Sequence, residues 1–479
     1  MVFLAFLLAV FVTGDANVDD RSLRRTDAGE QVTVRDTVPT FRYDFGIETG
    51  YDRIKEGTQE PERYASLSLL PEVYYGKVGV GLLATIRVHP RTGNFREEDF
   101  DRFRDYLALL HFVEYGTEEN PTNYARVGSM EDVSLGEGLF LDQYSNAHRI
   151  DDPMRGFTGA VADKHLYFEG VYSDLAAPGI AGFYAGYYPF GTEQRDLFSR
   201  LAFGIGLAAD LSTEGDLVNS KQPGAPFLLS SPPDSISTVV PVGEEDGSLF
   251  MVGADASVRW IETEAVTIVS FAEVGKIIDY GAGATLGARG KTDVSAVELQ
   301  AQYAQRFLGS QFLPDYFNSS FESQRIRSVS LSVNDRLEGG AVNTRRNELA
   351  GRTSSALGHK LHVEAELDDV FETTVGYETI WGEANTGRFH LDLEVYPSTL
   401  PVAVTLGYDR FNLQSLSNLL AVSRNNSLYR LGVAYEVIDP LRLGVEVRQN
   451  FEPVYRGGRV VDQRKQNRVE PYVRLTFRL

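Results

Sequence analysis

The sequence predicts an all-β fold, a transmembrane antiparallel β-barrel of about 16–18 strands, and three observations lead to this prediction. From Thr40 onward, long segments alternate between apolar and polar residues. Toward the C-terminus, the connections between these segments alternate between tight and long. After the N-terminal run, no stretch approaches the ~18 apolar residues of a membrane-spanning helix. Because backbone amides in lipid need internal partners, a membrane protein without such helices must be a closed barrel.

The C-terminal segment has the most informative alternation. Successive side chains of a strand point to opposite faces. One face of this segment would be apolar and the other polar, with Val473, Leu475, Phe477 and Leu479 opposing Tyr472, Arg474, Thr476 and Arg478. This pattern resembles the last strand of Gram-negative outer-membrane β-barrel proteins, including porins, although those strands more often end on Phe. The alternative is an amphipathic edge strand of a soluble β-sandwich.

The resemblance implies a location and partners. A protein of this kind is found in the outer membrane of a Gram-negative bacterium, in contact with outer-membrane lipid. The barrel-assembly machinery would engage its C-terminal strand. Small solutes or a polymer would be its cargo.

The lengths of earlier segments support the barrel over the sandwich. Residues 77–88 and 200–212 alternate over lengths close to the ~9–11 residues of a membrane-crossing strand. Strands of soluble proteins average only about 5–6 residues. In the second segment, one face would carry Leu201, Phe203, Ile205, Leu207, Ala209 and Leu211.

The C-terminal third predicts the direction of the barrel. Strands are expected at 357–367, 371–381, 388–396, 402–408, 429–437 and 441–447. Tight connections at 368–370, 397–400 and 439–440 alternate with longer ones at 382–387, 411–427 and 452–466. Outer-membrane barrels have short periplasmic turns and long extracellular loops. The C-terminus is therefore expected on the periplasmic side.

The N-terminal half is less regular. About twenty segments along the whole chain qualify as strands by alternation, and some of these are expected to be loop hairpins. Prolines in 216–247 exclude a central strand, so this segment is expected to be an external loop or one folded into the lumen. Residues 334–355 are expected to form a second long loop. The glycine-rich residues 124–146 predict a sharply curved strand or, alternatively, a place where a loop or ligand packs against the wall.

Composition and the N-terminus indicate export. The net charge of −21 argues against nucleic acid as a partner, because phosphate binding needs a basic surface. Cysteine is absent, which fits an exported protein that needs no disulfide. An apolar run at 2–12 is too short to span a bilayer but suits a secretory signal, although no Lys or Arg precedes it. The expected organisation is a signal peptide at 1–16, a periplasmic leader or linker at 17–39, and the barrel at 40–479.

Motifs for catalysis are absent from the sequence. No phosphate loop, dinucleotide fingerprint or zinc-protease helix occurs. His359 and His362 would lie on opposite faces of a strand, which argues against joint metal binding. His390 and Asp392 would share the lumenal face, either as an acid–base element or as a solvated pair. We therefore expect a protein that is not an enzyme and has no cofactor or metal.

The predicted inner faces carry opposite charges in two regions. These residues are candidates for lining a pore and setting its ion selectivity; alternatively, they pair across neighbouring strands and form a polar filling. The candidates are the acidic Glu364, Glu366, Glu378, Asp392 and Glu394, followed by Arg442, Glu446, Arg448 and Arg474.

Three functions follow as hypotheses. The first is a channel for small hydrophilic solutes. The second is an export or surface-assembly barrel for a polymer such as polysaccharide. The third is a non-transporting structural or adhesive surface protein.

Overall fold

The computed structural model describes most of the predicted barrel. The described residues are 41–54, 62–101, 103–117, 120–147, 153–190, 200–211, 248–263, 265–294, 296–333, 336–367, 370–381, 386–397, 400–413, 419, 427–438, 441–456 and 459–478. The predicted signal peptide, the predicted leader and the proline-rich segment 216–247 lie outside the described residues.

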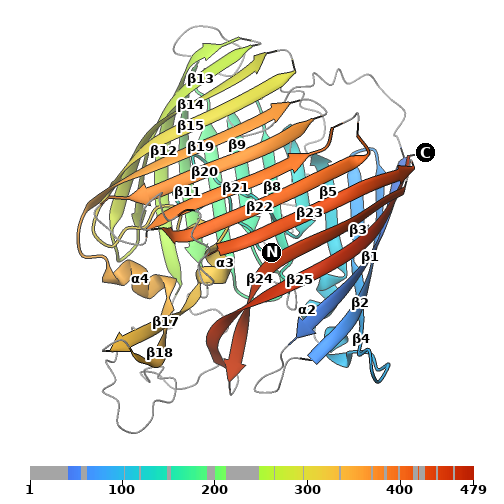
Figure 1. Cartoon of the computed structure of the whole chain (residues 1–479). Coiled ribbons are helices and arrows are strands. Elements are labelled where there is room, and N and C mark those ends of the chain that lie inside the picture. The colour runs from blue at the N-terminus through green and yellow to red at the C-terminus, as the bar shows by residue number, and fades with distance from the viewer. Residues whose placement is uncertain are drawn as a thin grey trace.

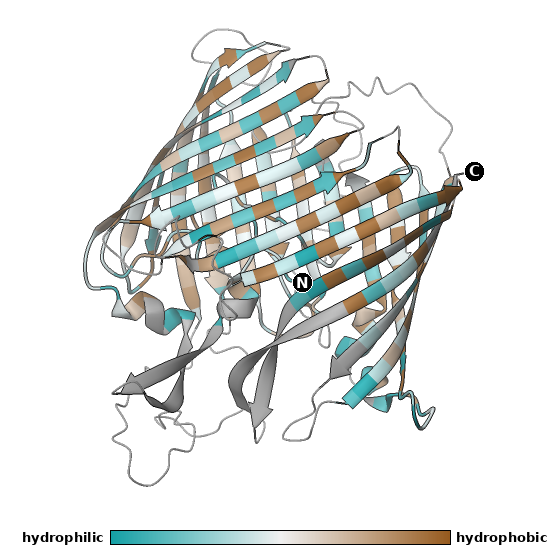
Figure 2. Ribbon diagram, viewed as in Figure 1, coloured by the Kyte–Doolittle hydropathy of each residue, from teal (hydrophilic) through white to brown (hydrophobic). Residues whose placement is uncertain are grey.

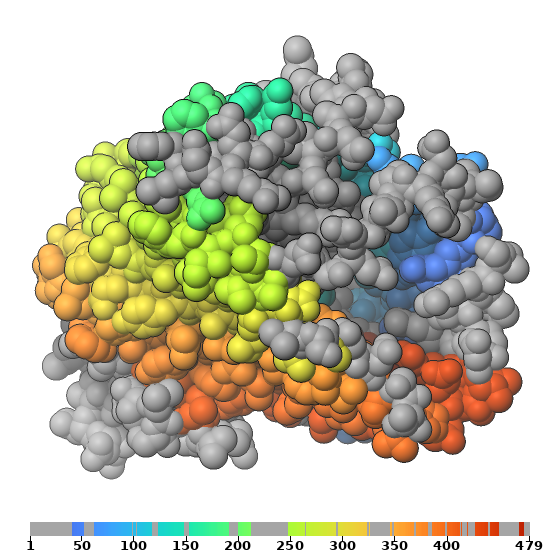
Figure 3. Space-filling view, turned by 90° about the horizontal axis from the view of Figure 1, so that it is seen from above, coloured from blue at the N-terminus to red at the C-terminus, as the bar shows by residue number. Residues whose placement is uncertain are grey.

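The described strands form a closed antiparallel barrel of 20 strands. β1 (Phe41–Ile54) pairs with β2 (Glu62–Tyr75) on one side and with β25 (Arg459–Arg478) on the other, which closes the ring. Seen from above, the chain runs around the ring in order, from blue through green and yellow to red (Figure 3). β3 (Val78–Leu82) and β4 (Ala84–Val88) both pair with β2 and make up one strand of the wall.

The other wall strands follow in chain order around the barrel (Figure 1). They are β5 (Leu110–Thr117), β6 (Asn120–Gly128), β8 (Gly156–Ala162), β9 (Leu166–Tyr172), β10 (Ile180–Tyr187), β11 (Leu201–Asp210), β12 (Leu249–Glu262), β13 (Val266–Ile277), β14 (Ala282–Val294), β15 (Val297–Leu308), β19 (Ala356–Leu367), β20 (Phe371–Ile380), β21 (Gly387–Val395), β22 (Val402–Leu413), β23 (Ser427–Ile438) and β24 (Leu441–Arg456).

The barrel architecture is confirmed, but the expected number of 16–18 strands is too low. A loop hairpin and a pair of wall strands have the same alternation of side chains, so sequence cannot separate them. Segments discounted as loop hairpins belong to the wall. The hairpin of β17 (Ile326–Val333) and β18 (Arg336–Thr344) is a separate sheet.

The two ends of the barrel differ in their connections. Connections 76–77, 118–119, 163–165, 263–265, 295–296, 368–370, 396–401 and 439–440 lie at one end, here called the turn end. The start of β1 and the last residues of β25 are also there. Most connections at the other end, here called the loop end, are longer. One long connection, 188–200, lies at the turn end.

Two predicted loops contain regular structure. Residues 452–466 were expected to form a long link, but β24 and β25 stay paired up to Arg456 and Arg459. Residues 334–355 contain β18 and α4 (Arg345–Gly351). Alternating residues extend β24 and β25 beyond the barrel wall. In the second segment, alternating residues form β18 and a helix-forming sequence follows as α4. At the loop end, η1 (Glu97–Phe100) and α2 (Phe103–Ala108) occupy a third connection.

The outer face of the barrel is apolar. Alternate wall residues are exposed and hydrophobic, including Ile205, which is 59% exposed, and Val274, which is 57% exposed. Figure 2 shows the resulting alternation of hydrophobic and hydrophilic residues along the strands. Among the described residues, no helix has the length and apolar character needed to cross a membrane.

The main hydrophobic core lies inside the barrel. Two segments, residues 129–147 and 309–325, fold against the inner wall and are here called the inner segments. They meet through a short parallel pairing of β7 (Leu141–Asp142) with β16 (Phe317–Asn318), and the second segment contains α3 (Phe321–Gln324). The core includes Leu139, Phe140, Tyr144, Phe312, Phe317 and Phe321.

Glycines on the inner wall make room for this core. A Cβ atom at Gly275 would lie 2.4 Å from the ring of Phe140, and one at Gly283 would lie 2.4 Å from the ring of Phe312. The glycine-rich residues 124–146 are therefore not one curved strand. β6 ends at Gly128, and the rest packs against the wall, as the alternative interpretation had it.

Candidate pore-lining site

Buried ion pairs attach the inner segments to part of the wall. Arg306 on β15 contacts Asp315 at 2.5 Å and Glu378 at 3.0 Å, and its side chain is only 6% exposed. A buried charge without a partner is strongly destabilising, so these contacts fix the inner segments in place. Three further pairs do the same: Arg289–Glu137, Arg325–Asp210 and Lys360–Asp142. Strands β11–β15 and β19 are here called the covered sector.

A buried hydrogen bond joins the two inner segments. The Tyr144 hydroxyl donates to Glu322 at 2.7 Å. Burial, and then the negative charge of Glu322, raise the pKa of Tyr144 well above its ordinary value. Tyr144 therefore remains a neutral donor at physiological pH.

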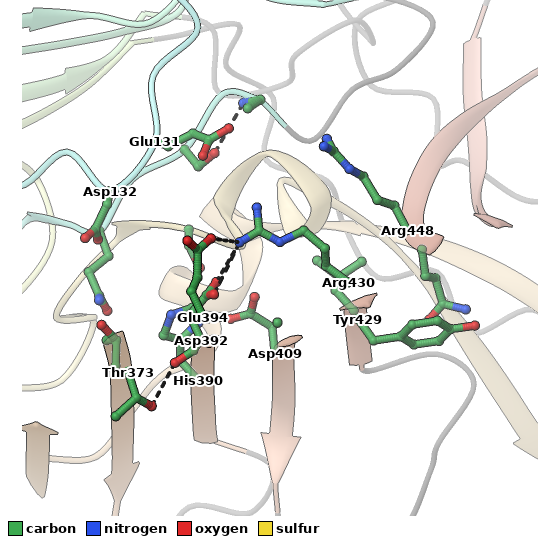
Figure 4. A pocket seen from close by; sticks show the side chains of 18 of the residues that line it. Glu131, Asp132, Thr373, His390, Asp392, Glu394, Asp409, Tyr429, Arg430 and Arg448 are labelled. Carbon is green, nitrogen blue, oxygen red and sulfur yellow. Dashed lines mark hydrogen bonds and ion pairs between the residues drawn. The ribbon is translucent and has the colours of Figure 1, made fainter. Parts of the chain in front are cut away.

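A cavity of about 410 Å³ separates the inner segments from strands β20–β24. Strands β21–β24 are here called the open sector. Figure 4 shows Glu131 and Asp132 of the first inner segment on one side of this cavity, and Arg430 and Arg448 on the other. The remaining acidic and histidine lining residues are Glu372, His390, Asp392, Glu394 and Asp409.

The charges in this cavity form partly exposed pairs. Arg430 donates to both oxygens of Asp392 at 3.2 and 3.3 Å, and both side chains are 34% exposed. Glu394 lies 3.9 Å from the same guanidinium. Exposed pairs of this kind hold their partners weakly. A charged solute could therefore compete for these groups.

His390 and Asp392 both line the cavity, so the prediction that they share the inner face is confirmed, but each contacts another residue. His390 Nδ1 lies 2.9 Å from Asp409 on β22, whereas Asp392 contacts Arg430. Residues 390 and 409 are direct partners across neighbouring strands, so the contact follows from register rather than from closeness in sequence.

Register aligns like charges across the wall. Glu298, Glu366, Glu372 and Glu394 are successive partners across β15, β19, β20 and β21. Positions 430, 448 and 468, all arginines, are successive partners across β23, β24 and β25. Like charges directly opposite each other destabilise a sheet. Charges of opposite sign lie beside both rows: Lys291 contacts Glu298, Arg430 lies 3.9 Å from Glu394, and Glu446 contacts Arg448.

The nine predicted pore-lining residues lie in different surroundings. Asp392, Glu394 and Arg448 line the cavity. Glu378 on β20 is enclosed next to the covered sector, between Arg306 and Arg388. Glu364 contacts His362, and Glu366 lies in the acidic row. On β24, Glu446 contacts Arg448, and Arg442 lies 3.9 Å from Glu436. The backbone of Arg474 pairs with Arg442 and Gly46, and its side chain lies outside the described part of the structure.

Three acidic residues of the cavity were missed from the sequence: Glu131, Asp132 and Asp409. Glu131 and Asp132 belong to an inner segment, where no alternation marks the direction of a side chain. Asp409 lies just beyond the predicted strand 402–408, in the longer β22. A strand extended by one residue would have placed Asp409 on the inner face.

The prediction that His359 and His362 lie on opposite faces of a strand is confirmed. His359 contacts Tyr303 and Trp381, which are exposed on the outer face, whereas His362 is buried and contacts Glu364. Within the described residues, no group of three or more acidic, histidine or cysteine side chains could hold a metal ion.

The closed ladder and the apolar outer face together decide the class of protein, because only a closed barrel satisfies every backbone group of a sheet in lipid. The molecule is a porin-like outer-membrane β-barrel. Bacterial barrels of this kind have an even number of strands, as do the 20 strands here, and the location is the outer membrane of a Gram-negative bacterium.

Solved porins resemble this barrel only distantly. No protein-family model and no curated protein match the sequence. The outer-membrane protein OpdK of Pseudomonas aeruginosa is 12% identical over 91% of this chain and 98% of its own, with a TM-score of 0.31. OccAB4 of Acinetobacter baumannii is 9% identical over 92% and 99%, with a TM-score of 0.33. A mutant porin of Rhodopseudomonas blastica is 7% identical over 92% and 100%, with a TM-score of 0.29. Because these scores are low, the porin-like barrel is assigned from its own geometry.

Proposed function

We propose that this barrel is a channel for small hydrophilic solutes. The supporting observation is the cavity of about 410 Å³ between the inner segments and β20–β24. Its size is within the range of roughly 300–1,000 Å³ that is usual for small-molecule sites. Its walls carry charges of both signs, which suit hydrated or charged solutes better than apolar ones. In this proposal the turn end faces the periplasm, as short turns do in outer-membrane barrels.

We further propose that the channel prefers cations. Charged rows on a pore wall set ion selectivity, and the row of Glu298, Glu366, Glu372 and Glu394 borders the cavity through its last two members. The burial and ion pairs of Glu378 favour a structural role for that residue. The proposed pore-lining residues are Glu364, Glu366, Asp392, Glu394, Arg442, Glu446, Arg448 and Arg474.

The test is conductance of the purified protein in planar bilayers. Wild-type protein should give current steps and a reversal potential that indicates cation preference in a salt gradient. The triple variant Glu366→Gln/Glu372→Gln/Glu394→Gln should move the permeability ratio toward unity. The triple variant with Asp at the same positions keeps the charges and is the matched control. A wild-type barrel that is folded but gives no current would refute the channel.

The two other hypotheses, a polymer-export barrel and a non-transporting surface protein, can be distinguished from a channel. Inner segments fixed by buried ion pairs narrow the lumen, which disfavours passage of a polymer. A folded barrel without conductance would favour a non-transporting surface protein. The expectation that the protein is not an enzyme stays a prediction.

A further inference from the structure

The seam that closes the barrel has an interrupted ladder. Ladder pairs of β1 and β25 run without a break up to Glu48 and Tyr472, and the next ladder pair is Tyr51 with Val469. Pro471 lies in the skipped stretch of β25. Proline has no backbone N–H and so removes a ladder hydrogen bond from a central strand. Instead, the Thr49 hydroxyl donates to the Pro471 carbonyl oxygen at 3.1 Å.

Beyond this interruption the two strands separate toward the loop end. The last residues of β1, up to Ile54, pair with β2, while β25 beyond Val469 pairs with β24. Figure 1 shows the red β24–β25 hairpin diverging from the blue β1 and β2. By contrast, the β24–β25 ladder continues with one irregularity as far as Arg456 and Arg459. Between Thr49 and Ile54, on the loop-end half of the described seam, Tyr51 and Val469 are therefore the single ladder pair of β1 and β25.

The surroundings of the seam are apolar outside and polar inside. On the outer face, Tyr51 and Val469 are each 47% exposed and Val445 is 46% exposed. On the inner side, Arg448 and Gln449 of β24 line the charged cavity. Position 448 of β24 is the ladder partner of position 468 of β25. Position 468 directly precedes Val469, which belongs to the last ladder pair of the seam. The polar cavity, whose described lining ends at β24, and the apolar outer surface thus lie on opposite sides of the wall next to the point where the ladder ends.

We propose that the β1–β25 seam opens laterally on its loop-end half and passes single-chain amphiphiles between the lumen and the outer leaflet. The polar head occupies the cavity near Arg448, and the chain leaves between Tyr51 and Val469. This route is distinct from the axial route of the proposed channel. An amphiphile suits it because each end of the molecule meets the surface that solvates it.

The absence of cysteine allows a clean test by a disulfide staple. The variant Tyr51→Cys/Val469→Cys joins the last ladder pair of the seam. The matched control, Leu406→Cys/Leu431→Cys, joins direct partners on the uninterrupted β22–β23 ladder. Vesicles containing the protein and enclosed albumin receive a fluorescent lysophosphatidylcholine from outside, and capture by the albumin reports its passage.

Oxidation of the seam staple should lower capture to the rate of protein-free vesicles, and reduction should restore it. The control staple should leave capture unchanged, and neither staple should alter axial conductance. Wild-type capture no faster than that of protein-free vesicles, or capture insensitive to the oxidised seam staple, would overturn the lateral route. A barrel that transfers the amphiphile but carries no current would instead refute only the channel.

A second variant tests the cause of the interruption. Pro471→Val supplies the missing N–H and should lower capture about five-fold, which corresponds to one net backbone hydrogen bond. Amide exchange at Thr49–Tyr51 should also slow. The control is Pro71→Val in β2, where the ladder to β1 is complete at the partner Phe45. Unchanged exchange and capture in Pro471→Val would also overturn the proposal.

Discussion

Two arginines on the inner wall have the same kind of partner but different surroundings. Arg306 in the covered sector is 6% exposed and contacts Asp315 of an inner segment. Arg430 in the open sector is 34% exposed and contacts Asp392 of a neighbouring strand. The first pair has lost its water and holds the inner segment in place, whereas the second can exchange partners with solvent ions. An inward charge therefore becomes structural or functional according to whether an inner segment covers it.

Apolar inner positions show the same difference. In the covered sector, Met251 and Ile277 face inward and are at most 2% exposed, beside the glycines that admit Phe140 and Phe312. In the open sector, the corresponding inner positions of β21–β24 carry charges that line the cavity. The covered sector is thus a hydrophobic core bounded by a wall, and the open sector is a wall that faces solvent.

The largest effect on stability is expected from breaking a buried ion pair of the covered sector. Arg306→Met leaves Asp315 and Glu378 without this cation and should cost about 3–5 kcal/mol. The measurement is the temperature at which the folded barrel band disappears in unboiled gels. Released inner segments should also widen the pore and raise single-channel conductance. A variant with wild-type stability and conductance would show that the pair does not hold the inner segment.

A smaller effect is expected on the outer face. Ile205 is 59% exposed near the middle of β11, and Ile205→Arg places a charge in lipid at a cost of about 2–4 kcal/mol at the bilayer midplane. The control is Thr374→Arg, which adds the same side chain inside the cavity. The first variant should assemble poorly in urea-refolding experiments and the second normally. Equal refolding would contradict the assignment of the outer face to lipid.

Local alternation predicted the barrel but not its interior. Strands such as β11 and β19 were predicted because each side chain's direction follows from position along the strand. The inner segments were not, because the burial of Phe140 depends on Gly253 and Gly275, more than a hundred residues away. Small residues at inner positions of otherwise regular strands were the available signal. They indicate that something bulky packs against the wall.

The candidate site was predicted in the same incomplete way. Asp392, Glu394 and Arg448 were expected on the inner face and line the cavity. Glu378 was expected with them, but Arg306 and Arg388 enclose it. Alternation specifies the face of a strand and contains no information about what lies opposite that face. Register also remained unknown, so the acidic row across four strands became visible only in the structure.

The smallest effect on stability is expected from the exposed pair. Arg430→Gln should change the free energy of unfolding by about 0–1 kcal/mol, because both members of the Arg430–Asp392 pair are one-third exposed. Its effect on conduction should be clear, since loss of this cation leaves Asp392 and Glu394 to attract permeant cations. The reversal potential should therefore shift toward stronger cation preference, and Arg430→Lys, which keeps the charge, is the control. A loss of stability as large as that of Arg306→Met would mean that the open sector is as tightly covered as the other. An unchanged reversal potential in a stable variant would instead place the path of ions away from Arg430.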